Sequence, residues 1–155
     1  QIISGWTFGN LKRSSWMSVV VSGCLLVMGA ALLSGWSWRL TVLTTGEERA
    51  RSLGINVERL RLHVFLICSF LIAGAVGFIG TVAFVGLVAP HCAKLMLGED
   101  QRYLLPSATI LGGLMLLASS IVSKLLSCGS MVPVGIITSI VGVPFLFVLL
   151  MKNGR

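Results

Sequence analysis

The sequence predicts an all-α protein: a polytopic transmembrane helical bundle with about five spans, one of them short or broken, plus a short cytoplasmic helix. Hydrophobic residues make up 55% of the 155 residues and charged residues only 11%, with a mean hydropathy of +0.96, which excludes an ordinary water-soluble domain. The charges also leave four long uncharged runs, at residues 14–38, 62–93, 103–123 and 125–151. Each run is solidly apolar and can hold a helix of about 20 residues, enough to cross a bilayer. A transmembrane β-barrel is not expected, because its strands would alternate apolar and polar residues.

The first run and the last two runs each predict one full span. We expect these spans at about residues 17–35, 103–126 and 134–151. Trp36 and Trp38 would mark the membrane interface after the first of them, because tryptophan collects at the headgroup level. The last span begins late because residues 127–133 are polar and contain Gly and Pro.

The run at residues 62–93 predicts two helices of unequal length. As one helix it would measure about 48 Å, too long for one untilted crossing, and it is too short for two full crossings with a loop. It is rich in Gly, and Pro90 removes a backbone donor and disfavours helix at Ala89. We expect a full helix from about Leu62, followed by a short one at about residues 84–97.

The distribution of the 12 Lys and Arg residues favours this arrangement. If the long run crosses once, the basic residues divide equally between the two sides. If it crosses and returns, the loop at residues 39–61, the loop at 94–102 and the C-terminus share one side and hold nine of the twelve. Cytoplasmic loops carry the excess of basic residues, so these loops and the C-terminus are predicted to be cytoplasmic. The net charge of +7 therefore indicates orientation in a lipid bilayer and no nucleic-acid partner.

We expect a single transmembrane permease domain over residues 1–155, with the cytoplasmic loop at 39–61 inside it. Five spans is an odd number, and the sequence opens with Gln1 and shows no signal peptide. These features predict the C-terminal half or a fragment of a larger permease-like protein.

Enzymatic chemistry finds no support in the sequence. There is no Walker A motif, no HExxH and no GxSxG, and all five acidic residues lie in the two predicted loops, where they cannot relay protons through the membrane. The four Cys residues are widely spaced and are expected to act as small buried hydrophobes. His63 is expected at the membrane interface, and His91 is expected to close backbone groups at a helix break. We predict no catalytic residue, metal or cofactor, and ATP hydrolysis only by a partner.

The loop at residues 39–61 predicts a short helix of its own. Thr45 with Glu48 three residues later is a capping box, and Gly54 is a good C-terminal stop. Asn56 is placed to cap the next transmembrane helix. A helix of about two turns is marginal alone in water, so it must pack on something. Two interpretations stay open: a solvated helix resting on lipid headgroups, or a docking helix for a cytoplasmic partner.

Small residues recur at spacings that allow close helix packing in lipid. A tightly packed bundle explains them, and a surface for a second permease subunit is the alternative. The pairs are Ala73 with Gly77, Gly74 with Phe78, Ala108 with Gly112, and Ser119 with Ser123.

Four stretches resemble signatures of the FecCD-type family of ABC importer permeases for iron siderophores, haem and cobalamin. Residues 45–54 are similar to its LG-E-x-A-x-x-LG motif, and residues 77–91 to GFVGLxxPH. Residues 98–106 resemble G-x-DHR-x-LLP, and residues 133–138 resemble PVGVVT. The segment from Trp6 to Trp16 also resembles the family's Trp-containing stretch before the sixth span. The resemblance covers nearly the whole chain in the family's order.

The resemblance implies a permease of about ten helices, of which this chain matches the last five. It implies a homo- or heterodimer with a second permease subunit, two cytoplasmic ABC ATPase subunits and an extracytoplasmic substrate-binding protein, in the bacterial cytoplasmic membrane. The family's short helix docks in a cleft of the ATPase. Carried over, the ATPase-coupling residues are Thr45, Gly46, Glu47, Glu48, Arg49, Ala50, Arg51, Ser52, Leu53 and Gly54.

The resemblance also implies helix breaks that shape the pathway, with the short helix after Gly80 ending at Pro90 and His91. The residues expected there are Gly77, Gly80, Gly86, Pro90, His91, Pro133 and Gly135.

The sequence departs from the family pattern in a few places. The acid before PVG is missing, Ser120 stands at a position that is often Asp, and Gln101 replaces the His of DHR. The missing acid puts the contact with a binding protein in doubt at this site. A non-transporting membrane anchor or truncated permease relative is the alternative function. A secondary transporter is a weaker alternative, because it would need ionisable groups at mid-membrane and the sequence shows none there.

Overall fold

The computed structural model describes residues 3, 15–128 and 132–154 of the chain. Every regular element in these ranges is an α-helix. The helices are α2 (Trp16–Thr44), α3 (Glu47–Ser52), α4 (Val57–Ile79), α5 (Val85–Leu97), α6 (Gln101–Leu126) and α7 (Val134–Asn153). Four of them, α2, α4, α6 and α7, are long and apolar enough to cross a membrane, and α5 is shorter. The predicted fold class is confirmed, including the short helix.

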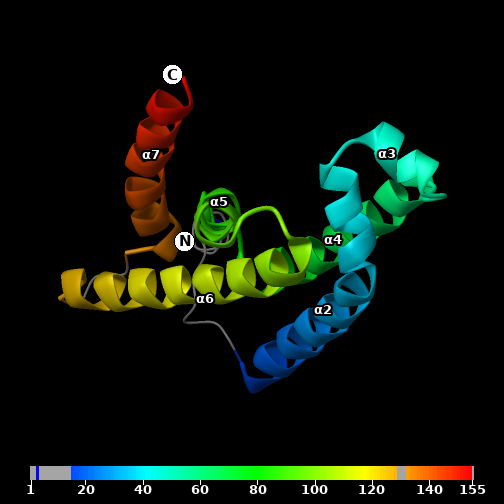
Figure 1. Cartoon of the computed structure of the whole chain (residues 1–155). Coiled ribbons are helices and arrows are strands. Elements are labelled where there is room, and N and C mark those ends of the chain that lie inside the picture. The colour runs from blue at the N-terminus through cyan, green and yellow to red at the C-terminus, as the bar shows by residue number, and fades with distance from the viewer. Residues whose placement is uncertain (1–2, 4–14, 129–131, 155) are drawn as a thin grey trace.

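Helix α6 is the element on which the others assemble. It packs most extensively against α5 and also contacts α2 and α7, while α2 contacts α4 and α3. Figure 1 shows α6 crossing the molecule, with α2, α3 and α4 gathered toward one end and α5 and α7 farther along it. Helix α3 therefore lies far from α7, at the corner where α2 ends and α4 begins (Figure 1).

Two helix ends differ from the predicted boundaries. Helix α2 continues past Trp36, Trp38 and Arg39 to Thr44, although a span ending near Gly35 was expected. Helix α4 begins at Val57, before the start expected near Leu62. The Asn56 side chain accepts a hydrogen bond from the Arg59 backbone N–H, so the prediction that Asn56 caps this helix is confirmed. Local capping chemistry, and not the position of charges, decides where these helices end.

The break inside the long uncharged run lies at residues 80–84. Gly80 ends α4 with φ of 86°, and Phe84 precedes α5 with φ of 66°, a left-handed conformation that is rare for a non-glycine residue. The short helix expected at about residues 84–97 is confirmed as α5. The end at Pro90 and His91 that the family resemblance implies is wrong, because both residues lie inside this helix.

Close packing explains why α5 tolerates Pro90. A proline in a helix interior removes one N–H donor, a loss that membrane helices accommodate where neighbouring helices cover the backbone. Ala89 and Ala93 are buried. A Cβ added at Gly112 of α6 would lie 3.6 Å from Ala89 Cβ, so the two helices approach closely beside Pro90.

Small residues mark several of the other helix contacts. A Cβ added at Gly74 would come within 2.6 Å of Leu25 Cδ1 of α2, and Ser119 and Ser123 are buried on α6. Gly77, in contrast, has no neighbouring atom within 4 Å of an added Cβ. The packing expected of Gly74, Gly112 and the Ser pair is thus confirmed, and no close neighbour within the described part of the chain explains Gly77.

Candidate docking site at the α2–α3–α4 corner

Helix α3 begins without the expected capping box. Its N-cap is Gly46, with φ of 123° and no side-chain cap. The Thr45 hydroxyl instead donates to the Val42 carbonyl, 2.7 Å away, because Thr45 is the C-cap of α2. The prediction that Thr45 starts α3 is therefore wrong. Glu47 and Glu48 do lie in the first turn, where negative charge suits the positive end of the helix dipole.

Helix α3 ends at Ser52, and Gly54 stops it as the sequence predicts. The Gly54 N–H donates to the Arg51 carbonyl at 3.0 Å, and the Ile55 N–H donates to the Ala50 carbonyl at 3.1 Å. This pair of bonds is the Schellman arrangement, which requires a left-handed residue after the C-cap. Gly54 supplies it with φ of 80° at no steric cost.

A small apolar core fixes α3 on the protein. Ala50 is fully buried together with Val42 of α2 and Val57 of α4, and Leu43 and Ile55 pack against this cluster. The short helix therefore leans on the ends of two transmembrane helices, which provides the support that six residues lack by themselves. Ala50, predicted as a coupling residue, is a packing residue with no exposed surface.

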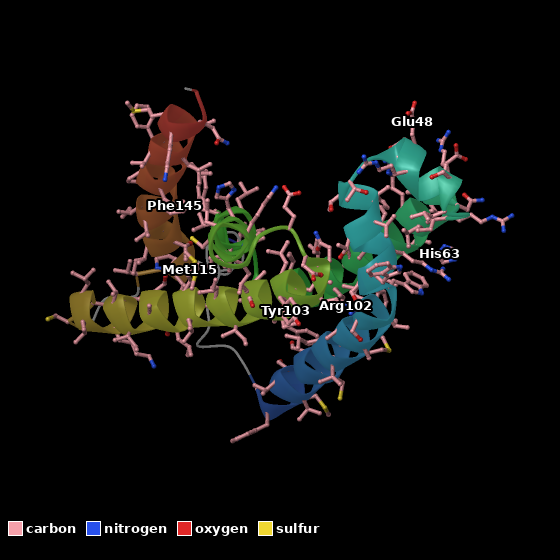
Figure 2. The ribbon with its side chains drawn as sticks, in the orientation of Figure 1. Glu48, His63, Arg102, Tyr103, Met115 and Phe145 are labelled. Atoms are coloured by element: carbon pink, nitrogen blue, oxygen red, sulfur yellow. The ribbon has the colours of Figure 1, made fainter. Side chains whose placement is uncertain are left out.

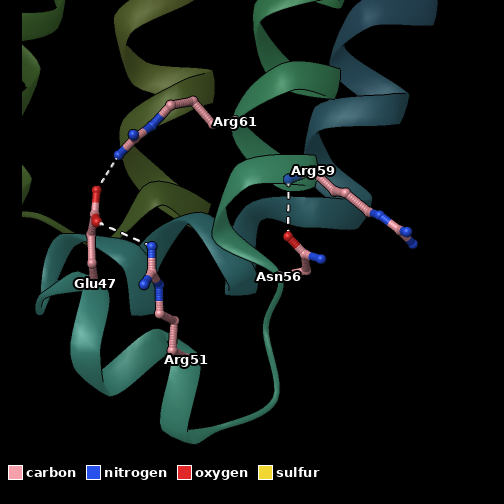
Figure 3. A network of polar contacts seen from close by, with 5 residues as sticks. All are labelled: Glu47, Arg51, Asn56, Arg59 and Arg61. Carbon is pink, nitrogen blue, oxygen red and sulfur yellow. Dashed lines mark hydrogen bonds and ion pairs between the residues drawn. The ribbon is translucent and has the colours of Figure 1, made fainter.

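Ion pairs also connect α3 to α4, as Figure 3 shows. Glu47 pairs with Arg61 of α4 and, at 3.9 Å, with Arg51 of its own helix. Glu47 thus faces back toward the membrane helices. Glu48 and Arg49 are exposed and form no ion pair within the described residues, and Figure 2 shows Glu48 at the outer edge of the molecule. The outward face of α3 carries unpaired charges beside Leu53, an exposed hydrophobic residue.

The turn between α5 and α6 lies beside the end of α2. The Thr41 hydroxyl accepts a hydrogen bond from the Gln101 N–H at 3.0 Å and lies 3.4 Å from Asp100 Oδ1. This contact brings the segments 39–61 and 94–102 together, as expected of two loops on one side of the membrane. The side on which the C-terminus lies stays a prediction.

The same turn carries an ion pair between Lys94 and Glu99, with Nζ 2.8 Å from Oε1. The hydrogen bond from Lys94, and then its positive charge, lower the pKa of Glu99 below the ordinary value. The pair links the last turn of α5 to the turn before α6.

An apolar groove of about 1170 Å³ opens between α2, α4 and α6. Its walls include Leu26, Ile72 and Ile110, and Gln101 and Arg102 line it where α6 begins. The Arg102 guanidinium lies 5.5 Å from the centre of the Trp38 ring, in a cation–π contact. No pattern in the sequence indicates this groove, because its lining residues are spread over three helices.

The residues expected at helix breaks are scattered through the bundle and form no joint site with α3. Gly80 is buried at the α4 end, Gly86 lies in the first turn of α5, and Pro133 is the N-cap of α7 with Gly135 buried just after it. The Ser123 hydroxyl of α6 donates to the Val132 carbonyl at 2.6 Å and so ties α6 to this start. Residues 129–131 and the Trp6 end of the N-terminal motif lie outside the described residues.

His63 lies at the α2–α4 contact: its ring meets Trp36 edge to face at 5.5 Å, and Nδ1 lies 2.6 Å from the Arg59 carbonyl oxygen. His91 is half-buried inside α5. Within residues 3, 15–128 and 132–154, no three His, Cys, Asp or Glu residues gather to hold a metal, and the four Cys are free thiols.

The helices and the corner at α3 define an α-helical, multi-pass membrane protein. A family model of the FecCD transport family matches residues 1–152, and the chain belongs to that family. It is similar to the cobalamin import system permease protein BtuC of Halobacterium salinarum, with 38% identity over 94% of this chain and 39% of that protein. The hemin transport system permease protein HmuU of Yersinia pestis is 33% identical, over 96% and 44%.

A solved structure shows the same arrangement of helices. It is an inward-facing conformation of a protein assigned to the metal-chelate type of ABC transporter, with a TM-score of 0.90 and 29% identity. The match covers 97% of this chain and 50% of that one. The chain thus spans about two fifths of the length of the curated relatives named above and half of the solved chain.

Proposed function

We propose that this chain forms part of the permease subunit of an ABC importer, and that α3 is the element on which a separate cytoplasmic ATPase docks. The observation that carries this proposal is the construction of α3. One face is buried through Ala50 and held by the Glu47–Arg61 ion pair, while Glu48, Arg49 and Leu53 face outward. Because this short helix is attached to two membrane helices, a movement of the bound partner can be transmitted to the bundle.

The proposed assembly contains this permease, a second permease subunit, two cytoplasmic ABC ATPase subunits and an extracytoplasmic substrate-binding protein. Its place is the bacterial cytoplasmic membrane, with α3, the α5–α6 turn and the C-terminus on the cytoplasmic side. ATP binding and hydrolysis belong to the ATPase subunits, and nothing in this proposal requires a cofactor on the permease.

The proposed cargo is a bulky metal chelate. Relatives are named for cobalamin, hemin and, in Bacillus subtilis, Fe(3+)-citrate import, all of which are metal complexes. The helix starts and breaks at Gly80, Gly86, Pro133 and Gly135 are proposed to shape the pathway, together with Gly77, Pro90 and His91 from the same motifs. Alternating access would then be a rigid movement of helices about such breaks.

Charge reversal of the outward face tests the docking role. Arg49→Glu is expected to weaken binding of the ATPase subunit and lower uptake, because Arg49 forms no ion pair within the described residues and is exposed. Lys124→Glu, with the same change of charge on an exposed residue near the far end of α6, is the control and should bind normally. Binding is measured by copurification and uptake in proteoliposomes with an iron chelate. Equal binding and uptake in the two variants would exclude docking through α3. Normal binding of the ATPase with no uptake of any chelate by the unaltered transporter would favour the anchor function.

A further inference from the structure

Thr41 forms a link between two helices that are distant in sequence. It lies near the end of α2, and its hydroxyl accepts a hydrogen bond from the Gln101 N–H at 3.0 Å. The single hydroxyl hydrogen is then directed either to the Ser37 carbonyl at 3.0 Å or to Asp100 Oδ1 at 3.4 Å. The partners at the start of α6 are 59 and 60 residues away along the chain, so the contact is entirely tertiary.

The link supplies part of the N-terminal cap of α6. The first N–H groups of a helix have no partner within the helix. The Asp100 carboxylate accepts from the Arg102 N–H at 3.1 Å, as an ordinary N-cap does, and Thr41 of α2 takes the Gln101 N–H. Both Thr41 and Gln101 are half-buried, which limits the access of water as a substitute partner.

Each end of this link is attached to a rigid unit. Val42, the residue after Thr41, is buried against Ala50 of α3 and Val57 of α4. On the other side, α6 packs closely on α5, where Ala89 meets Gly112. A displacement of α3 therefore has a continuous route through the end of α2 and the Thr41 hydroxyl into α6 and α5.

We propose that Thr41 is a positioning residue that makes α6 and α5 follow α3 when the ATPase moves it. This inference rests on the proposed docking role of α3. Thr41 touches neither the cargo nor the ATPase in this proposal, and it acts by keeping the start of α6 in register with the corner at α3.

The first test compares variants in the assembled transporter. Thr41→Val keeps the shape and removes the hydroxyl, and Thr41→Ser restores it. Thr44→Val is the matched control, because its hydroxyl bonds only to the Thr41 carbonyl within α2, at 2.6 Å, among the described residues. Thr41→Val is expected to lower the cargo transported per ATP hydrolysed on the order of threefold or more, with the ATPase still bound. Thr41→Ser and Thr44→Val should resemble the unaltered transporter. An unchanged ratio in Thr41→Val would overturn the coupling role.

The second test examines the link without reference to transport. Spin labels are placed at Ser52 of α3 and Tyr103 of α6, both exposed, in full chains whose four Cys are replaced. In lipid bilayers the distance between the labels should be narrowly distributed with Thr41 present and with Thr44→Val, and broader with Thr41→Val. Identical distributions in all three would show that the link does not hold the helices together. Failure of the docking proposal appears separately, as normal ATPase binding in Arg49→Glu.

Discussion

Arg61 of α4 forms an ion pair with Glu47, the first residue of α3, fourteen positions earlier in the chain. The neighbouring Glu48 is exposed and has no ion pair within the described ranges. Two adjacent glutamates of one helical turn therefore face different surroundings: Glu47 fastens the helix to the bundle, and Glu48 is available to a partner.

Glu47→Gln is expected to loosen α3, because it removes the charge that pairs with Arg61 and Arg51. Both sides of these pairs are about half exposed or more, so the loss of stability should stay within about 1 kcal/mol. Hydrogen exchange of the α3 backbone amides measures the loosening directly. Glu48→Gln is the control and should leave that exchange unchanged. Equally faster exchange in both variants would contradict the conclusion that Glu47, and not Glu48, attaches α3 to the bundle.

Gly54→Ala is expected to destabilise the end of α3 by about 1–2 kcal/mol, the cost of a left-handed conformation for a residue with a Cβ. Gly54→Asn should cost less, since Asn tolerates that conformation. Thermal unfolding in detergent gives the ranking. Gly35→Ala in α2, where an added Cβ meets nothing within 4 Å, serves as control and should be neutral or stabilising. If Gly54→Ala proves as stable as the parent chain, the Schellman end is excluded.

Gly142→Ala is expected to disturb the contact between α7 and the start of α5. An added Cβ would overlap Phe84 Cβ and lie 2.8 Å from Phe84 Cγ. The overlapping atom is Cβ, which is bonded to the backbone, so a change of side-chain rotamer at Phe84 cannot relieve the overlap. Overpacking of this kind costs about 1–3 kcal/mol. Gly113→Ala, a helical glycine with open space around it, should show no such loss in the same unfolding measurement.

The Lys94–Glu99 pair predicts a pH dependence of the α5–α6 turn. In the folded protein the pKa of Glu99 lies below the ordinary value of 4.5. The stability that ionised Glu99 contributes is therefore fully present above about pH 4.5, and it is lost as the pH falls through the lowered pKa. Lys94→Gln should raise the pKa of Glu99 back toward the ordinary value, while Lys124→Gln should not. Titration of the Glu99 carboxyl by NMR measures both, and an equal pKa with and without Lys94 would contradict the pairing.

The sequence predicts the helix plan well because membrane insertion depends on simple quantities: the length of uncharged runs and the placement of basic residues. It also predicts Asn56 as a cap and Gly54 as a stop, since each acts on backbone groups within a few residues. It fails at Thr45, because the Thr45 hydroxyl bonds to the end of α2 instead of capping α3. The helix end that the family resemblance implies at Pro90 also fails, because α5 continues through Pro90 where Ala89 packs on Gly112.

The missing parts of the site depend on contacts between distant segments. Thr41 belongs to no motif in the sequence. Its contact with the start of α6 is visible only in the folded chain, where α6 lies against α2. The groove between α2, α4 and α6 has the same origin. One local signal did exist: residues 98–106, which include Asp100 and Arg102, resemble a family motif, but the motif does not indicate which residues they contact.

The brevity of α5 has a consequence for how the protein enters the membrane during synthesis. The thirteen residues of α5 measure about 20 Å as a helix, less than the roughly 30 Å of the hydrocarbon layer. Helix α5 is therefore too short to be inserted by itself as a membrane-spanning segment. Its largest contact is with α6, which is made later along the chain. We expect α5 to stay at the membrane surface until α6 has been synthesised, and the two helices then to insert together as a hairpin.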